Sequence, residues 1–229
     1  MQPMTDLGFD EDEVSRRQTL LAERLDAVQQ RMFAVGGEHV SLLPVSKGHP
    51  VEAAIAARRL GLLQLGENYA QDLVAKAPVV AAAAGAVGWH FIGQLQSNKV
   101  RLMVDHVHTW QSVDRIKVGR EIAKRAPGSR VFAQVNLSSE SQKAGCSFDE
   151  IDALVQGLHD VGLDVAGLMG VGTAADERAT AAAFGQLRSN VDRLGLAECS
   201  MGMTADLEVA IRQGSTMVRV GSDLFGARK

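Results

Sequence analysis

Short apolar runs alternate with amphipathic stretches along almost the whole chain. The amphipathic stretches repeat their apolar residues at helical spacing, whereas the short apolar runs have the length of strands. The eight predicted strands span residues 41–46, 62–66, 89–93, 107–112, 131–137, 164–171, 197–200 and 216–220. Strands that alternate with helices are typical of an α/β fold with a parallel sheet and right-handed crossovers. Eight such units in 229 residues predict a single closed (β/α)8 TIM barrel.

Several helices are predicted from the same pattern, over residues 12–35, 50–60, 147–160, 176–194 and 204–213. Ser147 and Glu150 have the spacing of a capping box, and Thr204 stands at the expected start of the last of these helices. In the first helix the residues expected to face the core are Leu20, Leu21, Leu25, Val28 and Met32. The alanine-rich stretch 81–85 is expected to be a surface connection.

One barrel domain over residues 12–229 accounts for these elements, with residues 1–11 as a flexible N-terminus. Neither an interdomain linker nor an internal repeat is visible. A doubly wound open sheet is the alternative architecture. The barrel is favoured because the strand count is eight and no Gly-x-Gly-x-x-Gly follows the first strand, where an open dinucleotide fold would have it.

Composition and charge exclude several classes of function. The net charge of −3 gives no basic face for nucleic-acid binding. No apolar run is long enough to span a membrane, and the acidic N-terminal segment does not have the pattern of a signal peptide. The two cysteines, Cys146 and Cys199, are too few for a disulfide framework and lack metal-ligand spacing. The sequence therefore predicts a protein of the reducing cytoplasm.

The barrel brings candidate chemistry from both ends of the chain to one rim. Active sites of such barrels collect at the carboxyl ends of the strands, and phosphate sites recur after strands 7 and 8. Lys47 ends the first strand, residues 200–204 follow the seventh, and Gly221 and Ser222 follow the eighth. Closure places the first strand beside the eighth. A buried lysine has a lowered pKa and can present the neutral amine that forms an imine, although most lysines are surface charges.

The loops after the last two strands have the composition of an anion cradle. Gly221 permits a close approach of backbone N–H groups, and Ser222 adds a hydroxyl. Ser200 and Gly202 supply further donors from the neighbouring loop. Turn and capping residues are the structural alternative for this set.

Arg219 is a charged residue in a predicted buried strand. It lies between Val218 and Val220, so its side chain is expected on the opposite face from both. Its structural alternative is a salt bridge with Glu67 or Asp206. Its functional role would be to donate a hydrogen bond to the ring nitrogen of a bound pyridine, which would then stay unprotonated.

Several motifs in order resemble one known family, the YggS/PROSC family of pyridoxal phosphate-binding homeostasis proteins. The resemblance runs from about residue 12 to residue 229 and is carried by Pro44-Val45-Ser46-Lys47, the segments 66–71 and 89–99, Ser200-Met201-Gly202-Met203 and the segment 214–221. It implies the barrel of the alanine-racemase N-terminal type, which is fold type III of pyridoxal 5′-phosphate (PLP) proteins.

The resemblance also implies roles for single residues. It makes Lys47 the aldimine lysine and places Arg219 at the pyridine nitrogen. The residues it assigns to the phosphate are Ser200, Gly221 and Ser222, and those it assigns to the pocket wall are Asn68 and Met201. His49 stands where relatives often carry a second lysine proposed to help cofactor transfer. Lys143 matches another family lysine, whose role is either cofactor exchange or surface charge.

Three functions compete on this basis. The leading one is a monomeric, non-enzymatic protein that holds PLP and buffers it or delivers it to PLP-dependent apoenzymes. The second is a PLP-dependent amino-acid racemase or lyase, with His90 as a proposed base. It is less favoured because Tyr69 is the only tyrosine and no residues remain for the second domain of racemases. The third is an aldolase-like barrel, which leaves Arg219 unexplained.

Overall fold

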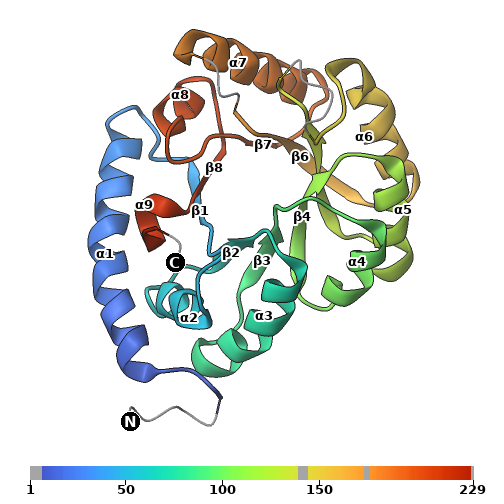
Figure 1. The fold of residues 1–229 in the computed structure, drawn as a ribbon. Helices are drawn as coiled ribbons and strands as arrows, with labels where there is room; N and C mark the ends of the chain where they lie inside the picture. The colour runs from blue at the N-terminus through green and yellow to red at the C-terminus, as the bar shows by residue number, and fades with distance from the viewer. Residues whose placement is uncertain (1–6, 139–143, 173–175, 228–229) are drawn as a thin grey trace.

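The computed structural model describes residues 7–138, 144–172 and 176–227. Eight parallel strands surround the centre of the molecule and helices surround the strands (Figure 1). The strands are β1 Ser41–Pro44, β2 Gln64–Glu67, β3 Gly88–Phe91, β4 Val107–Val113, β5 Arg130–Val135, β6 Asp164–Gly170, β7 Glu198–Ser200 and β8 Met217–Val220. Each of them overlaps the strand predicted at that place in the sequence, so the predicted (β/α)8 barrel is confirmed.

In the described part of the chain, helices precede, connect and follow these strands. They are α1 Glu11–Phe33, α2 Val51–Arg59, α3 Ala70–Ala84, α4 Ser97–Met103, α5 Ile116–Arg125, α6 Ile151–Asp160, α7 Glu177–Arg193, α8 Leu207–Arg212 and α9 Ser222–Phe225, with a 3-10 turn at Phe148–Glu150. The predicted capping box of Ser147 and Glu150 is present at the start of that turn. None of the described helices is apolar over a length that would cross a membrane.

The strand order is β1-β8-β7-β6-β5-β4-β3-β2, which puts the first strand beside the last. Leu43 of β1 is in register with Arg219 of β8, and the N–H of Val45 donates to the carbonyl of Val220 at 2.8 Å. The ring is completed between β1 and β2 by a bridge from Val45 to Gly66. The residue after this bridge, Ser46, donates its N–H to the carbonyl of Gly66 at 3.0 Å. Closure therefore fixes the two residues directly before Lys47 to the strands on either side of β1.

Apolar side chains fill both faces of the sheet. Val131 and Ala133 of β5 belong to the large cluster packed under the helices, so alternation directs Phe132 to the inside of the barrel. There it packs with Ala166 and Met169 of β6. Full burial of a side chain of this size contributes about 1.5–3 kcal/mol.

The structure departs from the prediction at residues 81–84 and at the start of α8. Residues 81–84 are the last turn of α3 rather than a surface connection, because alanine favours the helix strongly and the chain turns only at Gly85, where φ is +94°. Helix α8 begins at Leu207, three residues after Thr204. The carboxylate of Asp206 accepts the N–H of Met203 at 2.6 Å, so residues 203–206 form a separate turn before the helix.

The predicted flexible N-terminus also differs where the structure describes it. Residues 1–6 lie outside the described residues. Phe9 is buried in the main core, and the carboxylate of Asp10 accepts the N–H groups of Asp12 and Glu13 as the N-cap of α1. Burial of an aromatic ring and capping of a 23-residue helix hold residues 9–11 in the fold.

A buried ion pair between Lys76 and Glu67 stabilises the ends of β1 and β2, the two strands that the closing bridge joins. The ammonium of Lys76 on α3 lies 2.7 Å from a carboxylate oxygen of Glu67 and 2.9 Å from the carbonyl of Ser46. The other carboxylate oxygen of Glu67 accepts the N–H groups of Asn68 and Tyr69. Both charged side chains are almost fully enclosed. The pair thus joins the ends of β1 and β2 to α3, next to Lys47.

We expect Lys76→Met to lower the free energy of unfolding by about 3 kcal/mol, because it leaves the Glu67 carboxylate buried without its partner. Urea denaturation measures the loss. Lys117→Met on the exposed face of α5 is the matched control and should change the free energy by less than about 0.5 kcal/mol. Equal effects of the two substitutions would contradict the structural role of the pair.

Candidate functional site

A cavity of about 300 Å³ opens at the carboxyl ends of β1 and β8. Four of the residues selected from the sequence line it, namely Lys47, Arg219, Gly221 and Ser222. Its volume is within the range of small-molecule sites. The cavity therefore joins an amine, a guanidinium and a glycine-serine turn that are up to 175 positions apart in the chain.

Lys47 stands in a turn directly after β1. Gly48 has a φ of +69°, a conformation that an L side chain adopts only with strain, so this glycine lets the chain reverse immediately after the lysine. The side chain of Lys47 is half-buried and lines the cavity. The backbone before it is held by the closing bridge at Val45 and by the hydrogen bond from Lys76 to the carbonyl of Ser46. The amine is thereby presented from a rigid base.

Arg219 is buried at the floor of the same cavity. One of its terminal nitrogens donates to both the carbonyl and the hydroxyl of Ser200, each at 2.8 Å, and the other donates to the carbonyl of Gly170 at 2.7 Å. These contacts use three of the five guanidinium N–H groups. The remaining donors are available to a molecule in the cavity.

The charge of Arg219 is not neutralised by direct pairing. Burial lowers the pKa of Arg219 to about 10, an effect that the charge of Asp206 partly offsets, so the guanidinium stays protonated at neutral pH. In the described part of the chain no carboxylate lies within ion-pair distance of it. The proposed salt bridge to Glu67 is absent, because Glu67 pairs with Lys76. A buried cation held only by neutral oxygens is suited to meet an acceptor from the cavity side.

Gly221 and Ser222 form the junction between β8 and α9. A Cβ at Gly221 would lie 3.3 Å from the carbonyl oxygen of Val45, so the backbone segments that follow β1 and β8 approach each other closely here. The hydroxyl of Ser222 donates to that of Thr204 at 3.3 Å. The first N–H groups of α9 have no acceptor within the helix. This corner of the cavity thus offers hydroxyl and backbone donors together.

Arg31 of α1 fixes this corner from outside. Its guanidinium donates to the carbonyl of Thr204 at 2.9 Å and forms ion pairs with Glu208 and Asp223. The loop after β7 and the start of α9 are therefore tied to the same side chain. Sequence reasoning did not select Arg31, since nothing in an amphipathic helix distinguishes this arginine from a solvated one.

The other three residues that the resemblance assigns to the cofactor do not line the cavity, and neither does Gly202. Ser200 is fully buried beside Arg219, and Met201 is fully buried with its sulfur 3.6 Å from that of Cys199. Asn68 lies at the end of β2, and its buried side-chain oxygen has no hydrogen-bond partner within the described residues. Met203 and Thr204 belong to the predicted rim segment 200–204 but had been given no contact with the cofactor. They line the cavity, because the displaced start of α8 leaves them in the loop.

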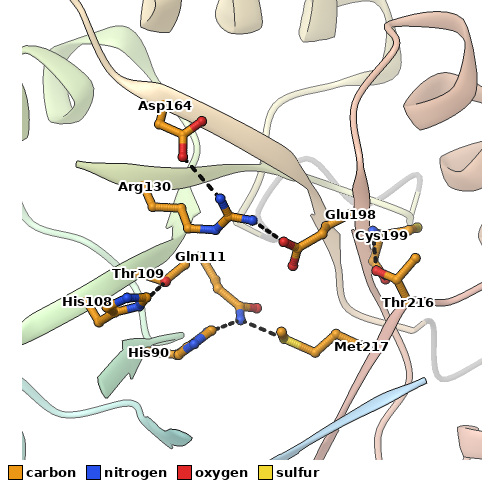
Figure 2. Close-up of polar contacts among 10 residues, drawn as sticks. All are labelled: His90, His108, Thr109, Gln111, Arg130, Asp164, Glu198, Cys199, Thr216 and Met217. Carbon is orange, nitrogen blue, oxygen red and sulfur yellow. Dashed lines mark hydrogen bonds and ion pairs between the residues drawn. The ribbon is translucent and has the colours of Figure 1, made fainter. Parts of the chain in front are cut away.

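Gln111 inside the barrel supports Ser200 and through it Arg219. Its side-chain oxygen accepts the hydroxyl of Ser200 at 2.7 Å. Its side-chain nitrogen donates to His90 at 2.7 Å and to the sulfur of Met217 at 3.1 Å (Figure 2). Sequence reasoning missed this residue. A polar side chain near the end of a predicted buried strand was the signal that could have found it.

His90 does not line the cavity, which leaves the base proposed for a racemase away from Lys47. It is buried, and desolvation, together with the charges of His108 and Arg130, lowers its pKa to about 3. His49 lines the cavity and packs on Phe225, with ring centroids 5.5 Å apart. Lys143 lies outside the described residues.

Comparison with known proteins matches this chain to a family. The model of the alanine racemase N-terminal domain matches residues 20–229. A pyridoxal phosphate homeostasis protein of Pseudomonas aeruginosa is 41% identical over 82% of this chain and 85% of its own length. A protein of the same name from Escherichia coli K12 is 36% identical over 83% and 87%. The chain belongs to the pyridoxal phosphate homeostasis protein family. The resemblance read from the sequence is confirmed.

Solved structures of similar proteins agree with this family. PipY of Synechococcus elongatus, solved with PLP bound, has 30% identity and a TM-score of 0.78, over 90% of this chain and 100% of PipY. A Bifidobacterium adolescentis protein has 32% identity and a TM-score of 0.83 over 95% and 97%. An alanine racemase of Clostridium difficile has only 16% identity, with a TM-score of 0.70 over 90% of this chain and 59% of the racemase, and shares the fold.

We expect the buried neutral state of His90 to make the protein sensitive to acid. Its folded pKa of about 3 lies below the ordinary 6.5, so below pH 6.5 the unfolded chain takes up a proton that the folded chain does not. Stability contributed by this group is full above pH 6.5 and falls by about 1.4 kcal/mol per pH unit toward pH 3.

Urea denaturation at pH 7 and pH 5 tests this expectation with His90→Asn, which keeps an acceptor for Gln111 but does not titrate. The variant should lose less stability between the two pH values than the unmodified protein. His39→Asn, at an exposed position, is the control and should behave like the unmodified protein. Equal losses in all three proteins would show that His90 does not determine the acid sensitivity.

Proposed function

We propose that this chain binds PLP through the amine of Lys47 and acts in PLP homeostasis, holding and releasing the cofactor without robust catalysis. The observation that carries the proposal is the shared cavity of Lys47, Arg219, Gly221 and Ser222. The names of the relatives and the PLP-bound PipY structure support it. Delivery to PLP-dependent apoenzymes, and a cytoplasmic, monomeric protein, belong to the same proposal.

The residues of the cavity fit the parts of this cofactor. An amine on a rigid turn suits attachment to an aldehyde, and hydroxyl and backbone donors at Ser222 and Gly221 suit a phosphate. The resemblance assigns Ser200 to the phosphate, but we propose a different role for this residue. Its hydroxyl contacts both Arg219 and Gln111, so it orients the guanidinium. We assign the phosphate to Gly221 and Ser222, with Thr204 beside them.

Arg219 favours holding the cofactor over demanding chemistry. Bound PLP supplies an electron sink, whose strength depends on protonation of its ring nitrogen. A guanidinium that stays charged donates a hydrogen bond and does not transfer its proton. Arg219 would therefore bind the ring while keeping its nitrogen unprotonated.

The arrangement of possible bases also supports a binding role. Racemisation needs positioned proton donors and acceptors at the reacting carbon. Tyr69 is half-exposed and His90 is enclosed in the barrel, and neither lines the cavity with Lys47. Many turnovers of an amino acid per protein molecule would contradict the binding role and favour the racemase or lyase.

The Lys47 assignment predicts that Lys47→Ala abolishes the visible band of the bound cofactor while the protein stays folded, because the amine that forms the covalent bond is removed. Absorbance after addition of PLP and gel filtration measures the band, and circular dichroism checks the fold. Lys124→Ala, at an exposed position of α5, should keep the band. A normal band in Lys47→Ala would refute the assignment.

For Arg219 we expect Arg219→Gln to shift the absorbance of bound PLP and to weaken its binding by about tenfold or more, the effect of losing one hydrogen bond from a charged donor. Titration followed by absorbance gives both quantities. The exposed Arg193, which pairs with Asp152 on the outer surface, supplies the control Arg193→Gln. An unchanged spectrum and affinity in Arg219→Gln would make Arg219 a purely structural residue.

A further inference from the structure

A second cavity, of about 540 Å³, lies between α1, the start of α2 and α9. Figure 1 shows these three elements side by side at the edge of the barrel. We propose that this cavity, here called the arginine groove for Arg16, Arg17 and Arg24, is a separate binding site for a phosphate monoester that carries a small ring. The cavity lined by Lys47, Arg219, Gly221 and Ser222 is here called the PLP cavity. None of the three arginines lines it.

The arginine groove is positive on a protein that is negative overall. Its lining contains the three arginines and one carboxylate, that of Glu13, which gives it a net charge of +2. The whole chain has a net charge of −3. Since nearby charges attract the opposite sign most strongly where water is partly excluded, a dianion fits this place better than a neutral or cationic ligand.

Hydrogen bonding leaves donors unused in the groove. Arg16 holds Glu13 with two nitrogens, at 2.7 and 2.8 Å, and Arg17 reaches the same carboxylate through its Nε at 2.6 Å. The terminal nitrogens of Arg17 have no acceptor among the described residues. Arg24 makes one bond, to the carbonyl of Leu224 at 3.3 Å, and has no carboxylate partner in that part of the chain. Two forked guanidinium groups are therefore available, and this geometry suits phosphate oxygens.

The remaining wall of the groove is apolar and suits a ring. Leu20 was expected to face the core with Leu21, but its side chain is 37% exposed and lines the groove. Pro50 and Phe225 complete this wall. A cavity of about 540 Å³ holds a molecule considerably larger than inorganic phosphate. The ligand class is thus an anionic phosphate monoester with an attached ring rather than a bare ion.

The arginine groove adjoins the PLP cavity without being part of it. His49 and Gly226 line both, and the ring of Phe225 packs on His49 at their boundary. Lys47 and Arg219 line only the PLP cavity, and the three arginines line only the groove. A protein that carries cofactor at Lys47 can therefore bind a second phosphorylated ring next to it. Only the choice of a pyridine ring as the probe rests on the proposed function.

The test begins with protein in which the first cavity is blocked. PLP is added, the complex is reduced with borohydride, excess reagent is removed, and mass spectrometry confirms one pyridoxyl group. Calorimetric titration then follows pyridoxine 5′-phosphate, which has no aldehyde and cannot bond to a lysine as PLP does. We expect one further equivalent to bind, more weakly at high salt, with inorganic phosphate and unphosphorylated pyridoxine both binding less tightly.

Variants connect this binding to the groove. Arg24→Gln and Arg17→Gln should each weaken it about tenfold, the factor for one charge-assisted hydrogen bond, and Arg24→Lys should restore part of it. Arg193→Gln on α7 is the control and should have no effect. Absence of a second equivalent, or equal binding by Arg24→Gln, Arg17→Gln and the control, overturns the proposal.

The two proposals fail in distinguishable ways. If no pyridoxyl mass appears after reduction, PLP attachment fails. The groove is then judged on unblocked protein by comparing Arg24→Gln and Arg17→Gln with Arg193→Gln. If the mass appears but the second titration shows no binding, the groove fails and PLP attachment stands. Thermal melting of every variant separates loss of binding from loss of folding.

Discussion

The pairing of β1 with β8 is the constraint on which the rest of the structure depends. It puts Leu43 beside Arg219 and the end of β1 beside Gly221, although more than 170 residues separate them in the chain. The bridge between Val45 and Gly66 and the buried pair of Lys76 with Glu67 then hold the backbone around Lys47. Lys47, Arg219 and Gly221 take their places in the cavity from this closure.

Within that frame, electrostatics distinguish the two cavities. Arg219 is buried, keeps its charge without a carboxylate, and is oriented by Ser200 and carbonyl oxygens, with Gln111 behind Ser200. In the arginine groove, Arg16 and Arg17 are nearer to water and share Glu13, while Arg24 bonds, within the described residues, only to the carbonyl of Leu224. A buried single cation selects one acceptor precisely, whereas a cluster near water attracts anions more generally. The first arrangement suits a covalently held ring and the second a reversible phosphate ligand.

Much of the fold was predictable because the barrel repeats one pattern that sequence periodicity records directly. The strand positions and the rim that joins Lys47 to Gly221 follow from local periodicity and from closure. The turn at 203–206 did not follow, because it depends on the contact of Asp206 with the N–H of Met203. The partner of Glu67 and the roles of Gln111 and Arg31 also depend on tertiary contacts. The exposure of Leu20 was not predictable either. Helical spacing alone places Leu20 on the same buried face as Leu21, and only the tertiary structure shows that Leu20 is exposed.

The central claim is that Lys47 is the lysine that holds a cofactor in this cavity. Peptide mapping by mass spectrometry, after the complex with PLP is reduced by borohydride, tests it most directly. We expect one pyridoxyl group per chain, on the peptide that contains Lys47. A pyridoxyl group on Lys76, Lys99 or another lysine, with Lys47 unmodified, would contradict it.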